Sequence, residues 1–227
     1  CTSANILSIN LHNLVNLEFL GCDSNKISSI DISKCINLKY LSCNNNNISS
    51  IDVSNCFDLR DFSCSNNKIS SIDLSNCVNL KIFQCNNNNI SSIDVSNCAK
   101  LEKLNCSNNR VSSIDVSNCV KLKGFVCSNN NISRLILDNN INTIHNISCY
   151  NNQITLFNFS KQPTYQIMVC NHLIISNKNT NLCKYLAKKY FNINETDNIK
   201  RVLLEQYSNL SKKEIMNKLK IIEYTKY

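Results

Sequence analysis

Cysteine is the residue whose abundance and spacing in this chain most directly suggest chemistry. The 227 residues include 15 cysteines, and most of these fall into two columns that recur every 21 residues. The first column is Cys22, Cys43, Cys64, Cys85, Cys106 and Cys127, and the second is Cys35, Cys56, Cys77, Cys98 and Cys119. Such thiols could form disulfides, bind zinc, act as nucleophiles or pack in a core.

The spacing favours core packing over the three chemical roles. Zinc needs four ligands that converge on one point, and the sequence contains no C-x-x-C pair. A nucleophile needs a nearby base, but His12, His145 and His172 do not recur with the repeat. Disulfides between neighbouring turns remain the second possibility, although side chains in register point the same way. We therefore expect reduced, shielded thiols, with no metal, no cofactor and no catalytic residue.

Carboxylates form another column with the same period. It consists of Asp31, Asp52, Asp73, Asp94 and Asp115. A ladder of carboxylates could hold calcium. The simpler expectation is that each aspartate accepts hydrogen bonds from the backbone or serine hydroxyls of its own turn.

The elements that position these columns follow from the leucine spacing. Leucines recur at a constant 21 residues: Leu17, Leu38, Leu59, Leu80, Leu101 and Leu122. Aligned on them, the unit is L-x-x-L-x-C-x-x-N-x-I-S-S-I-D-V-S-N-C-x-x. Its first six residues predict a short strand with alternate residues inward, and strands of successive turns should pair in parallel. The second half is too short for a helix, so we expect extended or 3₁₀ segments on the back face.

Asparagine occupies the ninth position of each unit. The column is Asn25, Asn46, Asn67, Asn88, Asn109 and Asn130. We expect this residue to turn the chain out of the strand, while its amide bonds the backbone of the neighbouring turn. Stacked amides would then form an asparagine ladder that satisfies buried backbone groups.

The register loosens toward both ends. The first residue lies inside a repeat, and one extra residue enters the segment 138–143 before the pattern resumes at Ile144. A last degenerate copy contains Met168, Cys170 and Ile175, with Leu173 where asparagine is expected. Residues 1–176 are thus predicted to form about nine turns of one solenoid.

The last segment of the chain differs in period and in charge. From about residue 180 apolar residues recur at helical spacing, and Ser211 with Glu214 forms a capping box. Residues 177–227 carry 11 Lys and Arg against 5 Asp and Glu, whereas residues 1–176 carry 13 against 11. We predict a helical C-terminal cap that seals the core, with a partner-binding module as the alternative.

The outward strand positions vary from turn to turn, in contrast to the inward ones. Aromatic and aliphatic side chains at the third position lie beside basic side chains at the second. Together they give the candidate ligand-binding residues Phe19, Tyr40, Arg60, Ile82, Lys39 and Lys81. Aromatics flanked by arginine and lysine are typical of the residues that dominate protein interfaces.

The repeat L-x-x-L-x-C-x-x-N-x-I-x-x-I-D-V-S resembles the 21-residue leucine-rich repeats of bacterial surface proteins, and among these an internalin with a cysteine ladder. The resemblance implies an α/β leucine-rich-repeat solenoid, with a concave face of parallel strands that binds a protein ligand and no enzymatic activity. The second cysteine column and the basic tail depart from that pattern.

These observations predict a monomeric, non-enzymatic protein-binding scaffold, with a small-molecule substrate and nucleic acid disfavoured as ligands. A bacterial surface or secreted location is favoured. The alternative is a cytosolic adaptor, whose repeats hold a target while its helical tail recruits a second protein, because so many unpaired thiols suit a reducing compartment. No apolar run is long enough to span a membrane.

Overall fold

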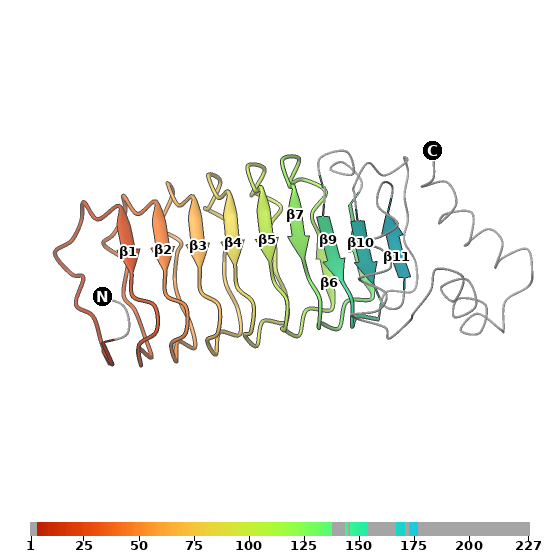
Figure 1. Ribbon diagram of the computed structural model, residues 1–227. Coiled ribbons are helices and arrows are strands. Elements are labelled where there is room, and N and C mark those ends of the chain that lie inside the picture. Colours follow the sequence, from red (N-terminus) through yellow and green to blue (C-terminus); the bar gives the residue numbers. More distant parts are fainter. Residues whose placement is uncertain (1–3, 138–143, 145, 154–166, 171–172, 177–227) are drawn as a thin grey trace, which may run out of the picture.

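The computed structural model describes residues 4–137, 144, 146–153, 167–170 and 173–176 (Figure 1). The predicted helical cap at 177–227 lies outside the described residues, as does the segment 138–143 that holds the extra residue. Within the described part of the chain no helix is long and apolar enough to cross a membrane.

A single sheet runs along one side of the molecule, with its strands side by side (Figure 1). Its strands are β1 Phe19–Gly21, β2 Tyr40–Ser42, β3 Asp61–Ser63, β4 Ile82–Gln84, β5 Lys103–Asn105, β7 Gly124–Val126, β9 Asn146–Cys149, β10 Ile167–Cys170 and β11 Leu173–Ser176. Strands β1 to β10 of this sheet pair in parallel. The predicted parallel-strand solenoid of the leucine-rich-repeat type is confirmed.

The register follows the repeat. Leu20 is paired with Leu41, Leu41 with Phe62, and Phe62 with Phe83, so each strand lies one 21-residue unit from its neighbour. Beyond the extra residue the pattern resumes, because Phe125 of β7 is paired with Ile147 of β9. The inserted residue is therefore absorbed outside the strands.

The last strand departs from the predicted repeat. Strand β10 continues the parallel sheet, but β11 turns back and pairs with it antiparallel, with Cys170 opposite Leu173. Leu173 stands where the repeat has its ladder asparagine, so this position has no amide to continue the ladder. The segment predicted as the end of a degenerate copy is instead the second strand of a hairpin.

The back of the solenoid is extended, which is one of the two conformations expected. A short two-stranded parallel sheet forms there from β6 Ser113–Asp115 and β8 Arg134–Ile136. Elsewhere the described part of the back face consists of turns and extended chain without helix.

The core consists of the inward columns stacked along the rod. In the middle turns the leucines of the first position, the Leu or Phe of the fourth and both cysteines are buried to 2% exposure or less. The rings of Phe62 and Phe83 stack with centroids 5.4 Å apart. Equivalent inward residues on successive turns pack on one another, so one contiguous core extends from turn to turn.

The asparagine ladder is present as predicted, and Asn88 shows its bonding. Its Nδ2 donates to the backbone oxygens of Cys64 and Cys85, both at 3.0 Å, and its Oδ1 accepts from the backbone N–H of Ile69 at 3.0 Å. Asn46 and Asn130 make the same set of bonds in their own turns. Each amide thus joins two successive turns through buried backbone groups.

The turn out of the strand is made one residue earlier than predicted. The left-handed conformation lies at the eighth position, not the ninth, with φ between 54° and 58° at Ser24, Asn45, Asn66, Asn87, Asn108 and Asn129. Asparagine tolerates this region better than most residues. The ninth position therefore supplies the ladder, while the eighth supplies the turn.

Candidate functional site

The predicted aromatic pair is brought together on the outer face of the sheet. Phe19 and Tyr40 are paired residues of β1 and β2, and their rings stack with centroids 4.5 Å apart and an angle of 4° between the planes. Phe19 is 62% exposed, whereas Tyr40 is half-buried. The two rings form a flat apolar platform, held in place by the backbone pairing beneath it.

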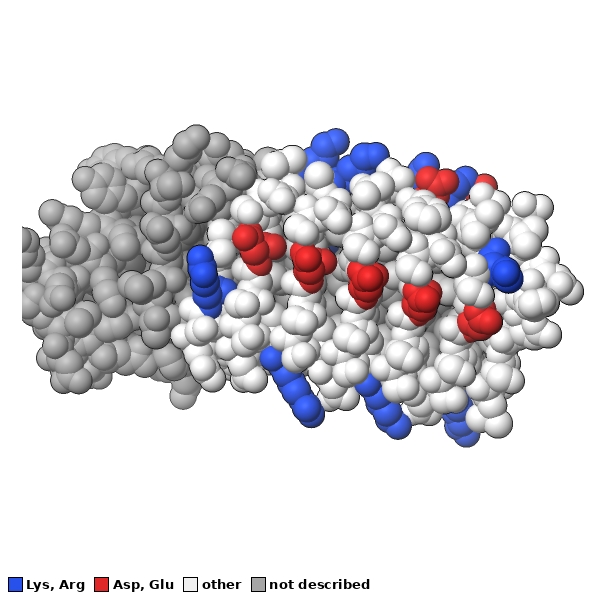
Figure 2. Space-filling view, turned by 180° about the vertical axis from the view of Figure 1, so that it is seen from behind, with Lys and Arg blue, Asp and Glu red and all other residues white. Residues whose placement is uncertain are grey.

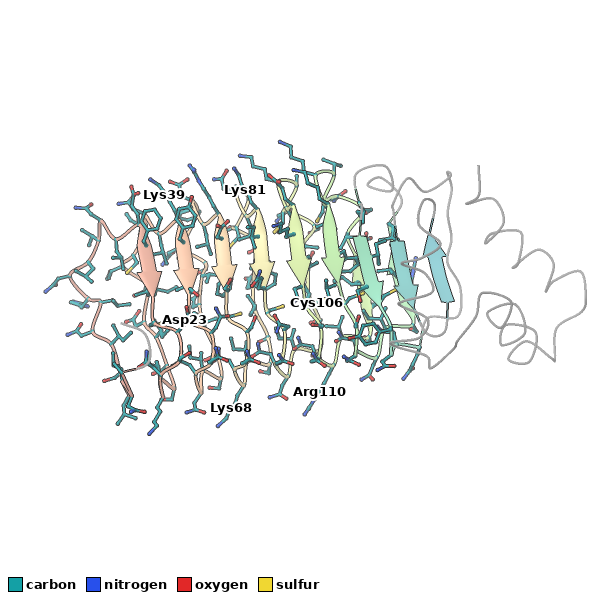
Figure 3. All side chains as sticks on the ribbon, in the orientation of Figure 1. Asp23, Lys39, Lys68, Lys81, Cys106 and Arg110 are labelled. Atoms are coloured by element: carbon teal, nitrogen blue, oxygen red, sulfur yellow. The ribbon has the colours of Figure 1, made fainter. Side chains whose placement is uncertain are left out.

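The predicted basic residues lie beside this platform, one position earlier on each turn. Lys39 and Lys81 project from the edge at which the strands begin (Figure 3). The Nζ of Lys39 lies 2.6 Å from the Oε1 of Glu18, so its charge is balanced within the protein. Arg60 and Lys81 are exposed, and both lie near the carboxyl of Asp61.

Ile82 is separated from the aromatic platform by Asp61, which is not among the predicted site residues. Asp61 is paired with Tyr40 on one side and Ile82 on the other. Partial burial raises the pKa of its carboxyl, and the nearby Lys81 and Arg60 oppose that rise. The surface therefore consists of an aromatic part, a half-buried carboxyl and a flanking basic row.

The cysteine columns are core, as predicted. Cys22, Cys35, Cys43, Cys56, Cys64, Cys77, Cys85, Cys98 and Cys106 are buried free thiols, and Cys119, Cys127 and Cys149 are buried in the same columns. Burial raises the pKa of Cys56 to about 11 and that of Cys98 to about 12. Thiols with such pKa values hold almost no thiolate at neutral pH, so they are poor nucleophiles and poor metal ligands.

The aspartate column lies exposed on the back, where Figure 2 shows a row of acidic side chains along the rod. Each carboxylate accepts the backbone N–H of the serine two residues later, at 2.9 Å for Asp52, Asp73, Asp94 and Asp115 and at 3.0 Å for Asp31. These bonds hold the pKa of Asp31, Asp52, Asp73 and Asp94 below the usual value. The predicted serine bonding is confirmed, and no group of three His, Cys, Asp or Glu in the described chain could hold a metal ion.

A further surface feature was not predicted from the sequence. The twentieth position of the repeat carries an exposed aliphatic or aromatic side chain in nearly every turn. These residues form what we name the turn stripe: Val15, Ile36, Phe57, Val78, Ala99 and Val120. The 21-residue spacing was visible, but only their exposure on the structure distinguishes them from core positions.

Comparison with known proteins agrees with this fold. Residues 15–56 match the family model of leucine-rich repeats (2 copies), and the same 21-residue spacing continues through the following turns. The predicted resemblance to leucine-rich-repeat proteins is confirmed. No curated protein sequence matches the chain.

Solved structures are similar at low sequence identity. A leucine-rich-repeat protein of Leptospira interrogans is 18% identical with a TM-score of 0.58, and the match covers 67% of this chain and 48% of that one. A chain of an octameric complex of Latrophilin 3, Unc5D and the leucine-rich repeats of FLRT2 is 22% identical, with a TM-score of 0.52, 66% of this chain covered and 60% of that one.

The functional domain of InlJ from Listeria monocytogenes, which includes a cysteine ladder, is 22% identical with a TM-score of 0.40, covering 70% of this chain and 45% of that one. In all three comparisons the match spans less than two thirds of the known chain. The two structures with TM-scores above 0.5 show the fold.

Proposed function

We propose that this chain is a non-enzymatic scaffold that binds a protein ligand on the outer face of its sheet. The observation that carries the proposal is the stacked pair of Phe19 and Tyr40 on the outer face, beside the exposed basic side chains of Arg60 and Lys81. Large aromatic surface next to arginine is the composition that dominates binding energy at protein interfaces. Lys39 and Ile82 complete the proposed surface.

The rigidity of the platform supports this role. Both aromatic residues stand on paired strands whose inward neighbours, Leu20 and Leu41, are buried in the core. A ligand that docks there orders little of the scaffold, so less binding free energy is lost to conformational entropy. Leucine-rich repeats also occur in the complex of FLRT2 with Latrophilin 3 and Unc5D, which is a precedent for protein partners.

The chemistry of the described residues favours binding over catalysis. The abundant thiols are shielded and have raised pKa values, and the aspartates are engaged by the serines of their own turns. Neither column offers an activated nucleophile or a general base with a raised pKa. The outer strand face, whose side chains vary from turn to turn, is therefore the surface that we propose binds the ligand.

The proposal is tested by comparing two variants as bait for proteins of the source cell and its surroundings. Tyr40→Ala removes half of the platform, whereas Asp73→Ala changes an exposed side chain on the back. Proteins retained by the wild type and by Asp73→Ala should be lost or strongly depleted with Tyr40→Ala. If Asp73→Ala loses them and Tyr40→Ala keeps them, the ligand binds the other side and the proposed surface is wrong.

A further inference from the structure

The turn stripe is an exposed apolar row that neither the core nor the proposed ligand site uses. Val15, Ile36, Phe57, Val78 and Val120 are 47–54% exposed. Each follows the second cysteine or its equivalent, at the apex of a tight turn. For example, the N–H of Leu59 donates to the oxygen of Cys56 across Phe57 at 3.1 Å.

The fold does not require large apolar side chains at these apexes. In the turn with Ala99, the N–H of Leu101 still donates to the oxygen of Cys98 at 3.0 Å, and both residues are fully buried. Turn apexes ordinarily carry polar residues. A contiguous apolar row on a solvent-exposed surface is typical of an interaction site.

The two sides of the stripe carry opposite net charges. On the back, each of five successive turns has an exposed aspartate, from Asp31 to Asp115. On the strand side basic side chains outnumber acidic ones. Lys39, Arg60, Lys81, Lys100, Lys121 and Lys123 lie there with Glu18, Asp58 and Glu102, and Lys39 and Lys123 are ion-paired with Glu18 and Glu102. Figure 2 shows the acidic row along the middle of the back, with basic side chains and a few acidic ones at the edge above it and basic side chains at the edge below.

We propose that a second copy of this chain covers the turn stripe and forms a parallel homodimer. A two-fold axis along the stripe places each residue of the row opposite its own equivalent, so the spacing of the two rows matches at every turn. The same axis places the basic row of each copy against the aspartates of the other. The contact is therefore self-complementary in both shape and charge.

Other occupants fit these features less well. An anionic lipid surface would be attracted to the basic row but repelled by the aspartates on the other side of the stripe. A helix rises about 5.4 Å per turn, which falls out of step with rungs about 4.8 Å apart. The segment 177–227 has a basic excess and does not complement the basic row.

The size of the surface predicts a weak dimer. The row spans about 24 Å at about 4.8 Å per turn, and a width of about 20 Å would bury on the order of 1,000 Å² in total. This is the low end for a specific interface, so association should be measured at high protein concentration. The dimer departs from the monomer predicted from the sequence.

The test is sedimentation equilibrium of the full chain in reductant over a wide concentration range. The average mass should rise toward that of a dimer, and added salt should weaken the association. The double variant Phe57→Ser with Val78→Ser should raise the dissociation constant at least about tenfold, whereas Leu7→Ser, an exposed apolar residue outside the stripe, should not. A chain that stays monomeric, or a dimer that the double variant leaves unchanged, overturns the proposal.

A second variant tests the orientation of the copies. Ile36 lies near one end of the stripe, so Ile36→Cys should cross-link to its own equivalent under mild oxidation only in the parallel arrangement. A denaturing gel without reductant should show much more dimer for this variant than for the wild type, because the thiols of the described residues are buried. Dimers in the ultracentrifuge without this cross-link would contradict the parallel axis. The inference is independent of the proposed ligand site, because the stripe variants leave Phe19 and Tyr40 in place.

Discussion

Replacing Asn88 with alanine should be among the most destabilising single changes in the solenoid. The side chain is 9% exposed and bonds the oxygens of Cys64 and Cys85 and the N–H of Ile69. Alanine removes all of these bonds at once and leaves buried backbone groups without their partner. A buried polar group left unsatisfied costs about 1–3 kcal/mol, and part of that cost is relieved by relaxation. We expect Asn88→Ala to lower the free energy of unfolding by about 2–4 kcal/mol.

The measurement is urea-induced unfolding of the wild type and variant at equal protein concentration, followed by circular dichroism. Asn89→Ala is the matched control, because Asn89 is exposed and its backbone N–H, which alanine keeps, bonds the oxygen of Ile69 at 2.8 Å. The control should change the free energy of unfolding by less than about 0.5 kcal/mol. If the two variants lose the same stability, or Asn88→Ala loses less than about 1 kcal/mol, the ladder does not stabilise the turns as argued.

Three further predictions follow from the columns of the repeat. A thiol reagent at about pH 8 should label few cysteines in the native protein and nearly all after denaturation without reductant. The reason is that burial shields the thiols and raises their pKa, to about 12 for Cys98. A denatured chain that stays unlabelled would indicate disulfides. Asn45→Ala should destabilise the fold by about 1 kcal/mol while Asn45→Gly should not, because the φ of this residue is 56°; equal losses in urea unfolding would refute this account of the turn. Hydrogen bonds from the backbone and side chain of Ser75 lower the pKa of Asp73. Its contribution to stability is therefore present above about pH 4 and is lost as the pH falls through its folded-state pKa. Thermal unfolding of Asp73→Asn should depend less on pH over this range than that of the wild type.

The inward half of the structure could be predicted from the sequence because the period fixes the register. Once Leu17 and Leu38 define a unit, every inward position repeats its environment, and a slip by one residue would expose the whole column. The buried thiols, the parallel strands and the ladder at Asn88 follow from that constraint. The stacking of Phe19 on Tyr40 also follows, since paired residues of neighbouring strands lie about 5 Å apart.

The turns and the ends were harder to predict. Consecutive asparagines occupy the eighth and ninth positions, as in Asn45 and Asn46, and composition alone does not show which of them adopts the left-handed conformation. The exposure of Phe57 depends on the conformation of the turn that contains it, which the hydrophobic pattern does not predict. The repeat pattern also did not show that β11 pairs antiparallel with β10. The helical cap at 177–227 stays a prediction.

The central claim is that the ligand docks on the outer strand face, and site-specific photo-crosslinking tests it most directly. A photoreactive phenylalanine analogue is placed at position 40 in one sample and at position 73 in another, and each is irradiated with the protein captured by the wild type. The account predicts a covalent adduct from position 40, beside Phe19, and none from position 73 on the back. An adduct from position 73 alone would contradict it.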